Sequence, residues 1–341
     1  MTSGERGVFM QKNFMIGISS RALFDLEEEN AIFESQGVEA YVHYQIAHEK
    51  EVLAPGAAFS LIQAFLALNR ERDSRQIEVV IMSKNSADAA LRIFHSIEYY
   101  GLDITRAALT GGGAIAPYLR AYGVDLYLSF NAEEVKNALQ SGIAAGVLLP
   151  RGAMENGGHA VSTRTFPGTY QQAYMRGQIR QPLEIRIAFD GDAVLFSGEA
   201  ERTFQEQGVE AFCAQERELA DVPLRPGPFA HILQLISELQ QRTEEMREGW
   251  KEDAGIPRIC TALVTARSAP AHERVIRTLR AWGLRIDQAF FLGGMDKSRV
   301  LEAFGAHIFF DDNEENVENA SAVVLSARVP WVEETMEQQV G

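Results

Sequence analysis

An internal repeat constrains the fold of this chain more than any other feature of its sequence. QGVEAY at Gln36–Tyr41 recurs as QGVEAF at Gln207–Phe212, and a Pro-Gly pair at 55–56 recurs at 226–227 with the same shift of 171 residues. After about 11 extra residues in the charged segment 240–255, the shift becomes 182. Five pairs share that second shift: Ser86-Ala87 with Ser268-Ala269, Gly101-Leu102 with Gly283-Leu284, Gly111-Gly112 with Gly293-Gly294, Gly123 with Gly305, and Asn131 with Asn313. Seven matches that need only two shifts indicate a duplicated unit.

Each copy of the repeat has the pattern of an α/β unit. Short apolar runs, typical of strands buried on both faces, alternate with segments of helical spacing. The expected strands are at 14–19, 77–82 and 126–128 in the first half and at 185–189, 260–264 and 307–312 in the second, and the clearest helices of the first half are at 26–47, 59–68 and 87–100. We therefore expect an α/β fold of two duplicated Rossmann-like units with parallel sheets.

Composition excludes several classes of protein. Lys and Arg number 32 against 47 Asp and Glu, and the resulting net charge of −15 argues against a general nucleic-acid or anionic-membrane binder. Cys213 and Cys260 are too few and too far apart for a disulfide framework or a zinc ribbon, which favours a reducing compartment. No run approaches 18 apolar residues and the first 14 residues lack a signal-peptide core, so a cytoplasmic protein is expected. Oligomeric state stays open, with a homo-oligomer as one option.

Two aspartates end the most distinctive strand of the second half. The stretch 185–196 reads IRIAFDGDAVLF, so Asp190 and Asp192 should emerge together at the carboxyl end of a strand, where ligands of open α/β sheets bind. Carboxylates that close repel each other unless a cation or a shared proton compensates them. The alternative is an ordinary turn, since Asp and Gly are common turn residues.

The repeat allows the two copies to be compared inside one sequence. The strand-end positions of the second half are Asp190, Asp192, Thr265, Lys297, Asp311 and Asp312, and the first half has, in the same order, Ser19, Arg21, Ser83, Ile115, Ser129 and Phe130. Both copies have similar core demands, so acidic pairs in only one of them are hard to explain by folding. The comparison favours a functional role for Asp190 and Asp192 over a turn.

The residue types at these positions fit phosphoryl transfer. Carboxylates at adjacent strand ends suit Mg²⁺, an aspartate is a competent nucleophile toward phosphorus, and a second carboxylate can serve as general acid and base. In VTARS at 264–268, the Thr265 hydroxyl and the amides of the next helix could bind an anion, and Lys297 could offset phosphoryl charge. Alternatives are a surface lysine for Lys297 and a helix N-cap for Asp312 or Asn313.

The order strand–DxD, strand–Thr, Lys, strand–DD resembles the four motifs of the haloacid dehalogenase superfamily of aspartate-nucleophile phosphohydrolases. The stretches ISSRALFDLEEE (18–29), MSKNSA (82–87), LTGG (109–112), AFDGDAVLFS (188–197) and HIFFDD (307–312) further resemble the cytosolic 5′-nucleotidase type I family. The resemblance covers the chain from about Met15 to Val329.

The resemblance implies Mg²⁺-dependent hydrolysis of nucleoside 5′-monophosphates to nucleosides and phosphate. Asp190 would be the nucleophile, Asp192 the general acid and base, and Thr265 and Lys297 would bind the phosphoryl group. The metal would be held by Asp190, the Asp192 carbonyl and Asp311, with Asp312 assisting. Further candidate substrate contacts are Arg267 and Ser268 in the second half and Arg21, Gly111 and Gly112 in the first.

The expected organisation is a degenerate domain of the haloacid dehalogenase type at 14–150, a linker at 151–182 and a catalytic domain at 183–335. A cap segment at about 197–258 would supply two helices, at 198–217 and 229–248, that cover the site. The first half either binds nucleotide, through Arg21 and the TGGG stretch, or serves as a scaffold, with the scaffold preferred. Rival functions are a phosphatase of another small phosphate ester and a nucleotide-sensing protein with vestigial motifs.

Overall fold

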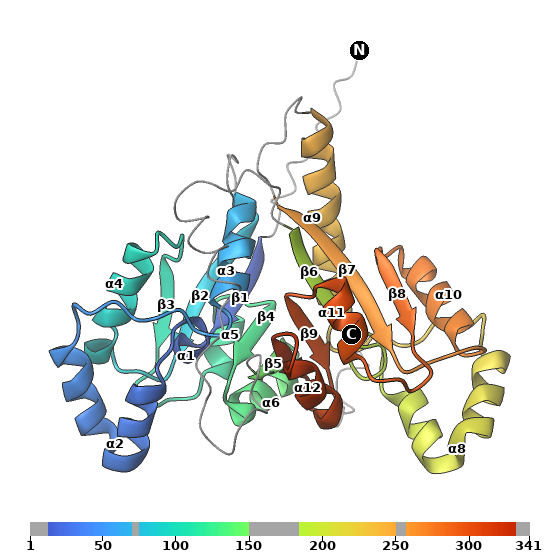
Figure 1. The fold of residues 1–341 in the computed structure, drawn as a ribbon, viewed down its shortest axis with the longest axis horizontal. Coiled ribbons are helices and arrows are strands. Elements are labelled where there is room, and N and C mark those ends of the chain that lie inside the picture. The colour runs from blue at the N-terminus through green and yellow to red at the C-terminus, as the bar shows by residue number, and fades with distance from the viewer. Residues whose placement is uncertain (1–12, 70–74, 150–183, 250–256, 332–341) are drawn as a thin grey trace.

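Ten strands form one continuous sheet in the computed structural model, which describes residues 13–69, 75–149, 184–249 and 257–331 (Figure 1). The order across the sheet is β3-β2-β1-β4-β5-β10-β9-β6-β7-β8. The strands are β1 (Phe14–Ile18), β2 (Ile77–Ser83), β3 (Arg106–Leu109), β4 (Leu126–Ser129), β5 (Ala144–Leu149), β6 (Glu184–Phe189), β7 (Arg258–Thr265), β8 (Gln288–Phe291), β9 (Ile308–Asp311) and β10 (Ser326–Arg328). The predicted α/β fold class is confirmed.

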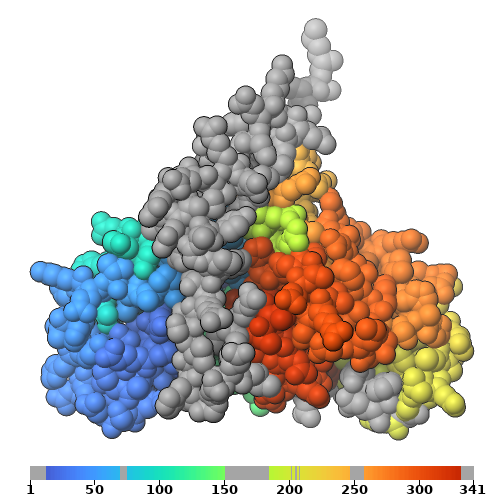
Figure 2. All heavy atoms as spheres, in the orientation of Figure 1, coloured from blue at the N-terminus to red at the C-terminus, as the bar shows by residue number. Residues whose placement is uncertain are grey.

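The duplication is visible in the strand order. Read outward from the centre, the first half runs β5-β4-β1-β2-β3 and the second runs β10-β9-β6-β7-β8, so the copies are arranged about the middle of the sheet. Within each half all pairings are parallel, and β5 pairs antiparallel with β10 through Leu148 and Ala327. The two expected parallel sheets are therefore joined edge to edge. The halves lie side by side along the long axis of the molecule (Figure 2).

Helices cover the sheet in both halves. The first half has α1 (Ser20–Leu23), α2 (Glu27–Ala47), α3 (Phe59–Leu66), α4 (Leu91–Tyr99), α5 (Ala116–Ala121) and α6 (Ala132–Gln140), and the second has α8 (Glu199–Glu218), α9 (Ala230–Gly249), α10 (His272–Trp282), α11 (Ser298–Phe304) and α12 (Glu314–Ser321). One hydrophobic core cluster includes residues of both halves, among them Leu148, Ile187 and Phe310. None of the helices in the described part of the chain combines the length and apolar character needed to cross a bilayer.

The repeated sequence QGVEA marks a kink rather than a regular helix. Gly37 in α2 has φ 85° and ψ −179°, and Gly208 in α8 has φ 82° and ψ 177°. Side chains with a Cβ rarely adopt a positive φ, so glycine is needed at both bends. In Figure 1, α2 and α8 take corresponding places at the two sides of the molecule.

The two helices expected in the cap segment differ in what they pack against. Helix α9 contributes Ile232, Leu233 and Ile236 to the core, because its apolar residues recur with helical spacing on the face that meets the sheet. It thus corresponds to α3 of the first half, whereas α8 lies beyond the carboxyl ends of β6 and β7 (Figure 1). The expected linker at 151–182 lies outside the described residues, and the division into domains stays a prediction.

Candidate active site

The carboxyl ends of three neighbouring strands bring the second-half motifs together. Strand β6 lies between β9 and β7, with Phe189 opposite Phe310 on one side and Leu263 on the other. Asp190 follows β6 directly, Asp311 ends β9 and Thr265 ends β7. Side chains 46 and more residues apart in sequence therefore meet at one edge of the sheet, as the sequence pattern predicted.

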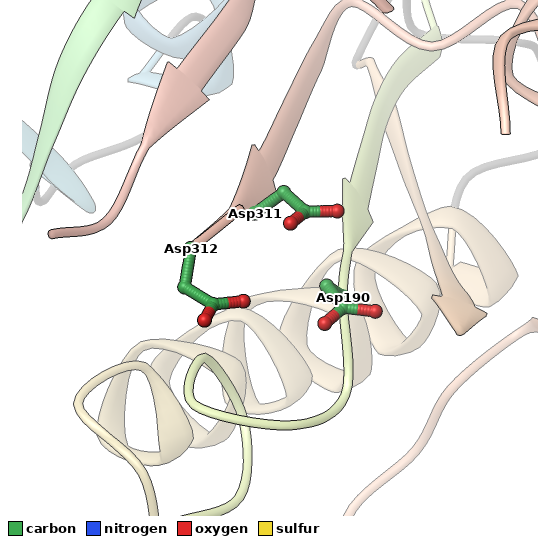
Figure 3. Close-up of side chains that lie close together, drawn as sticks. All are labelled: Asp190, Asp311 and Asp312. Atoms are coloured by element: carbon green, nitrogen blue, oxygen red, sulfur yellow. The ribbon is translucent and has the colours of Figure 1, made fainter. Parts of the chain in front are cut away.

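Asp190, Asp311 and Asp312 form an acidic cluster (Figure 3). One carboxylate oxygen from each lies within 4.8 Å of the others, and Asp311 is completely buried. The Lys297 ammonium lies between two of them, with Nζ 2.7 Å from Asp190 Oδ1 and 2.6 Å from Asp311 Oδ2. Carboxylates outnumber the ammonium in this cluster by three to one. An oxygen-only donor set with this excess of carboxylates fits a hard divalent cation.

Burial and charge set the protonation of this cluster. Burial raises the pKa of Asp190 well above its usual value, Lys297 opposes that shift, and the neighbouring carboxylates of Asp311 and Asp192 add to it. Burial alone would lower the pKa of Lys297, but Asp190 and Asp311 outweigh it and raise the pKa, so the ammonium stays protonated. A divalent cation at the cluster would favour ionised Asp190, the form that a nucleophile requires.

Asn316, on α12, is a cluster residue that the sequence analysis did not find. Its Nδ2 donates to Asp311 Oδ2 at 3.2 Å, and the backbone N–H of Asn313 donates to Asp311 Oδ1 at 2.9 Å. These two donors orient the Asp311 carboxylate. The side-chain Oδ1 of Asn313 accepts a hydrogen bond from the backbone N–H of Asn316. Of the two residues considered as the N-cap of this helix, Asp312 and Asn313, it is therefore Asn313 that caps it.

Thr265 packs against the backbone that joins the two motif aspartates. Its side chain is buried, and a Cβ added at Gly191 would lie 3.3 Å from Thr265 Oγ1. The glycine of the DGD motif therefore lets this hydroxyl approach the turn closely. Thr265 Oγ1 also accepts a hydrogen bond from the Arg267 N–H at 3.2 Å.

The side chain of Asp192 is directed at Arg267 rather than at the acidic cluster. Arg267 Nε lies 2.7 Å from Asp192 Oδ2 and Arg267 Nη2 lies 2.7 Å from Asp192 Oδ1, a bidentate ion pair. Arg267, one of the candidate substrate contacts, thus holds a candidate catalytic residue instead. Ser268, the neighbouring candidate, is exposed and lies next to Gly293.

Glu216 on α8 completes this arrangement, and sequence motifs did not reveal it. Its carboxylate is fully buried between Arg267 and Arg274, with Arg274 Nη1 2.8 Å from Glu216 Oε1. The repeat could have found it, because the 171-residue shift places Glu216 opposite Gln45, so that the charge occurs in one half only.

The first-half candidates are separated from the cluster by β4, β5 and β10. Arg21 pairs with Glu27 through two hydrogen bonds of 2.9 and 2.8 Å and lies over the Phe130 ring. The amides of Gly111 and Gly112 donate to the backbone carbonyls of residues 85 and 84, at 3.1 and 2.8 Å. These groups are therefore engaged within the first half, and the expected anion nest at TGGG has no free glycine amides at 111 and 112.

Comparison with known proteins places the chain in a family. A family model described as 5′-nucleotidase matches residues 8–336. The human protein named cytosolic 5′-nucleotidase 1B is 37% identical over 312 residues, which cover 89% of this chain and 47% of the human protein. The chain spans about half the length of this curated relative. The match includes both halves of the duplicated sheet and every residue of the acidic cluster, and on this basis the chain belongs to the 5′-nucleotidase family.

Proposed function

We propose that this protein is a Mg²⁺-dependent 5′-nucleotidase that hydrolyses nucleoside 5′-monophosphates to nucleoside and phosphate through an aspartyl-phosphate. The observation that carries the proposal is the convergence of Asp190, Lys297 and Asp311 at one sheet edge, with Asp192 alongside. At the corresponding edge of the first half, all four of these positions hold other residues, with Ser19 in place of Asp190. The described residues of that edge form no acidic cluster.

In the first step, a carboxylate oxygen of Asp190 attacks phosphorus and the bond from phosphorus to O5′ breaks. The electron pair of that bond goes to O5′, which takes a proton from the Asp192 carboxyl group, so that the nucleoside leaves as a neutral alcohol. In the second step, Asp192 takes a proton from a water molecule that attacks the aspartyl-phosphate. Phosphate is released and the Asp190 carboxylate is restored.

Three other groups act on the phosphoryl oxygens. The Lys297 ammonium is a fixed positive charge beside the nucleophile, and the Thr265 hydroxyl is available at the end of β7. Mg²⁺ held by Asp190, Asp311 and Asp312, with the Asp192 carbonyl as the further oxygen that the family resemblance implies, would supply charge that offsets that of the phosphoryl group. Bound there, the cation would also offset the repulsion among the carboxylates of the cluster.

The first half is proposed as a scaffold. Arg21 uses Nε and Nη2 in its pair with Glu27, and the 111 and 112 amides are bonded to backbone carbonyls, which supports a structural role for these groups. A cytoplasmic location belongs to the same proposal. It is supported by the two free cysteines, Cys213 and Cys260, and by the word "cytosolic" in the name of the human relative.

A panel of phosphate monoesters, assayed with and without Mg²⁺, tests the function. Turnover of one or more nucleoside 5′-monophosphates above all sugar phosphates is expected, with loss of turnover on chelation. Preference for a sugar phosphate would replace the proposal by a phosphatase of another ester. Asp190→Asn should abolish turnover while the far-ultraviolet circular dichroism is retained, and full activity in that variant would contradict the covalent mechanism. A chain with no turnover that still bound nucleotide would favour the sensing role.

A further inference from the structure

A chain of four charged side chains, three of them buried, joins helix α8 to the motif; its members are Asp192, Arg267, Glu216 and Arg274. Arg267 has 2% of its side chain exposed, and its guanidinium uses Nε and Nη2 on Asp192 and Nη1 on Glu216. Glu216 has no exposed side-chain surface and accepts from Arg274, which in turn donates from Nε to the carbonyl of Val222 at 2.8 Å. Two carboxylates and two guanidinium groups alternate, so the chain as a whole is neutral.

Glu216 supports Arg267 from the side opposite Asp192. The Phe212 ring lies one turn earlier on α8, with its centroid 5.4 Å from Cζ of Arg267, and packs against the guanidinium group. With Nη1 bound to Glu216, only the edge formed by Nε and Nη2 is left for Asp192. A buried bidentate pair of this kind fixes the plane of the carboxylate as well as its distance. Each Asp192 oxygen keeps a second lone pair for a proton or a substrate oxygen.

The first half retains the arginine that pairs with the kinked helix and lacks the two charges that join this helix to the motif. Arg92 corresponds to Arg274 and is likewise buried, but Gln45 stands in place of Glu216 and Asn85 in place of Arg267. Arg92 finds its carboxylate at Glu29 and lies 3.5 Å from Gln45 Oε1. Both halves therefore attach their kinked helix through a buried arginine. Only the half with Asp192 continues the chain inward to the motif.

We propose that Glu216 is a positioning residue for the reaction: through Arg267 it holds the Asp192 carboxyl group where it can exchange a proton with O5′ of the substrate. The inference rests on the proposed function, because it assigns a partner to the group that protonates the leaving oxygen. It also explains why α8 carries a buried acid where α2 carries an amide. The position of α8 therefore affects how efficiently Asp192 protonates the leaving nucleoside.

The test uses substrates that differ in their need for the acid. A nucleoside 5′-monophosphate is compared with the analogue in which sulfur replaces O5′, since a thiolate leaves without protonation. In Glu216→Gln, kcat for the monophosphate should fall by about 10²-fold, the range of general acid catalysis, while kcat for the thio analogue and both KM values change by less than about threefold. Gln45 shows that the fold accommodates glutamine at this position of the kinked helix.

Glu29→Gln is the matched control, because it breaks the buried pair with Arg92 in the other half. It should lower the thermal midpoint without changing kcat for either substrate. Equal losses of kcat on both substrates in Glu216→Gln would reduce Glu216 to a structural anchor of α8 and overturn the proposal, as would full activity on the monophosphate. If Glu216→Gln does not fold, Glu216→Asp, which keeps the charge and shortens the side chain, is held to the same criteria.

The wild-type enzyme separates failure of this inference from failure of the proposed function. Wild-type protein that hydrolyses neither substrate contradicts the nucleotidase assignment itself. Wild-type protein that hydrolyses both, with no substrate-dependent loss in the variant, contradicts only the role of Glu216. Arg267→Asn, which installs the residue of the first half, should reproduce the selective loss on the monophosphate.

Discussion

Gly227 and its copy Gly56 offer a direct test of the proposal that only the second half is catalytic and that the first half is a scaffold. A Cβ at Gly227 would lie 2.4 Å from the carbonyl oxygen of Phe196 and 2.5 Å from that of Val194. At Gly56 the nearest atom would be the carbonyl oxygen of Ala22, at 2.8 Å. The same close approach in both copies therefore explains the repeated Pro-Gly pair. In each half the glycine lies against the loop or short helix that follows the first strand.

Alanine at either position forces that loop to move. Ordinary contact begins at 3.4 Å, so the backbone near Gly227 must shift by about 1 Å, and overpacking of this size costs about 1–3 kcal/mol of unfolding free energy. The loop next to Gly227 begins at Gly191, whose carbonyl accepts from the amides of residues 195 and 196, so the shift reaches Asp192. A displacement of about 1 Å at the chemistry lowers kcat by about 10²-fold.

The measurement pairs urea unfolding with steady-state kinetics on the two variants. Both should lose stability, Gly56→Ala should keep kcat within about twofold of the wild type, and Gly227→Ala should lose about two orders of magnitude. Kinetics are recorded at a temperature at which both variants are folded. Equal losses of kcat in the two variants would refute the view that only the second half carries chemistry. An unchanged kcat in Gly227→Ala would refute the inference that the backbone shift at Gly227 displaces Asp192.

Three further outcomes are expected. Burial lowers the pKa of His307 to about 4, so below pH 6.5 the unfolded chain takes up the proton first, and the free energy of unfolding should fall by up to about 3 kcal/mol between pH 6.5 and 4. His307→Asn should flatten that part of the urea-midpoint profile, and an unchanged profile would contradict the assignment. Lys297→Met should lose turnover and about 3–5 kcal/mol of metal-free stability, because two buried carboxylates lose their counter-ion, and added Mg²⁺ should restore more stability to the variant than to the wild type. Arg21→Ala should leave kcat, KM and nucleotide binding unchanged, since its exposed pair with Glu27 contributes at most about 1 kcal/mol; weaker nucleotide binding would give the first half a ligand role.

Much of this protein was readable from its sequence. The duplication, the α/β class and the convergence of Asp190, Lys297 and Asp311 follow from patterns along the chain, because parallel strands deliver their carboxyl ends to one edge of a sheet. The same patterns led to the family that comparison with known proteins established. Comparing the two copies separated the positions that both halves share from those at which only the second half has the residues proposed for chemistry.

Other features were decided only in three dimensions. The joining of the halves through β5 and β10 uses backbone groups that every residue supplies, so no side-chain pattern marks it. The assignment of α9 to the sheet depended on which surface its apolar face met, and the engagement of the Gly111 amide depended on a carbonyl of another loop.

The pairing of Arg267 with Asp192, and of Glu216 with Arg267, belongs to the same category. These residues are 75 and 51 positions apart, and each would be an ordinary surface charge in another fold. A local sequence pattern specifies what a residue can do, whereas the partner that a buried charge requires is fixed only when distant segments are packed together.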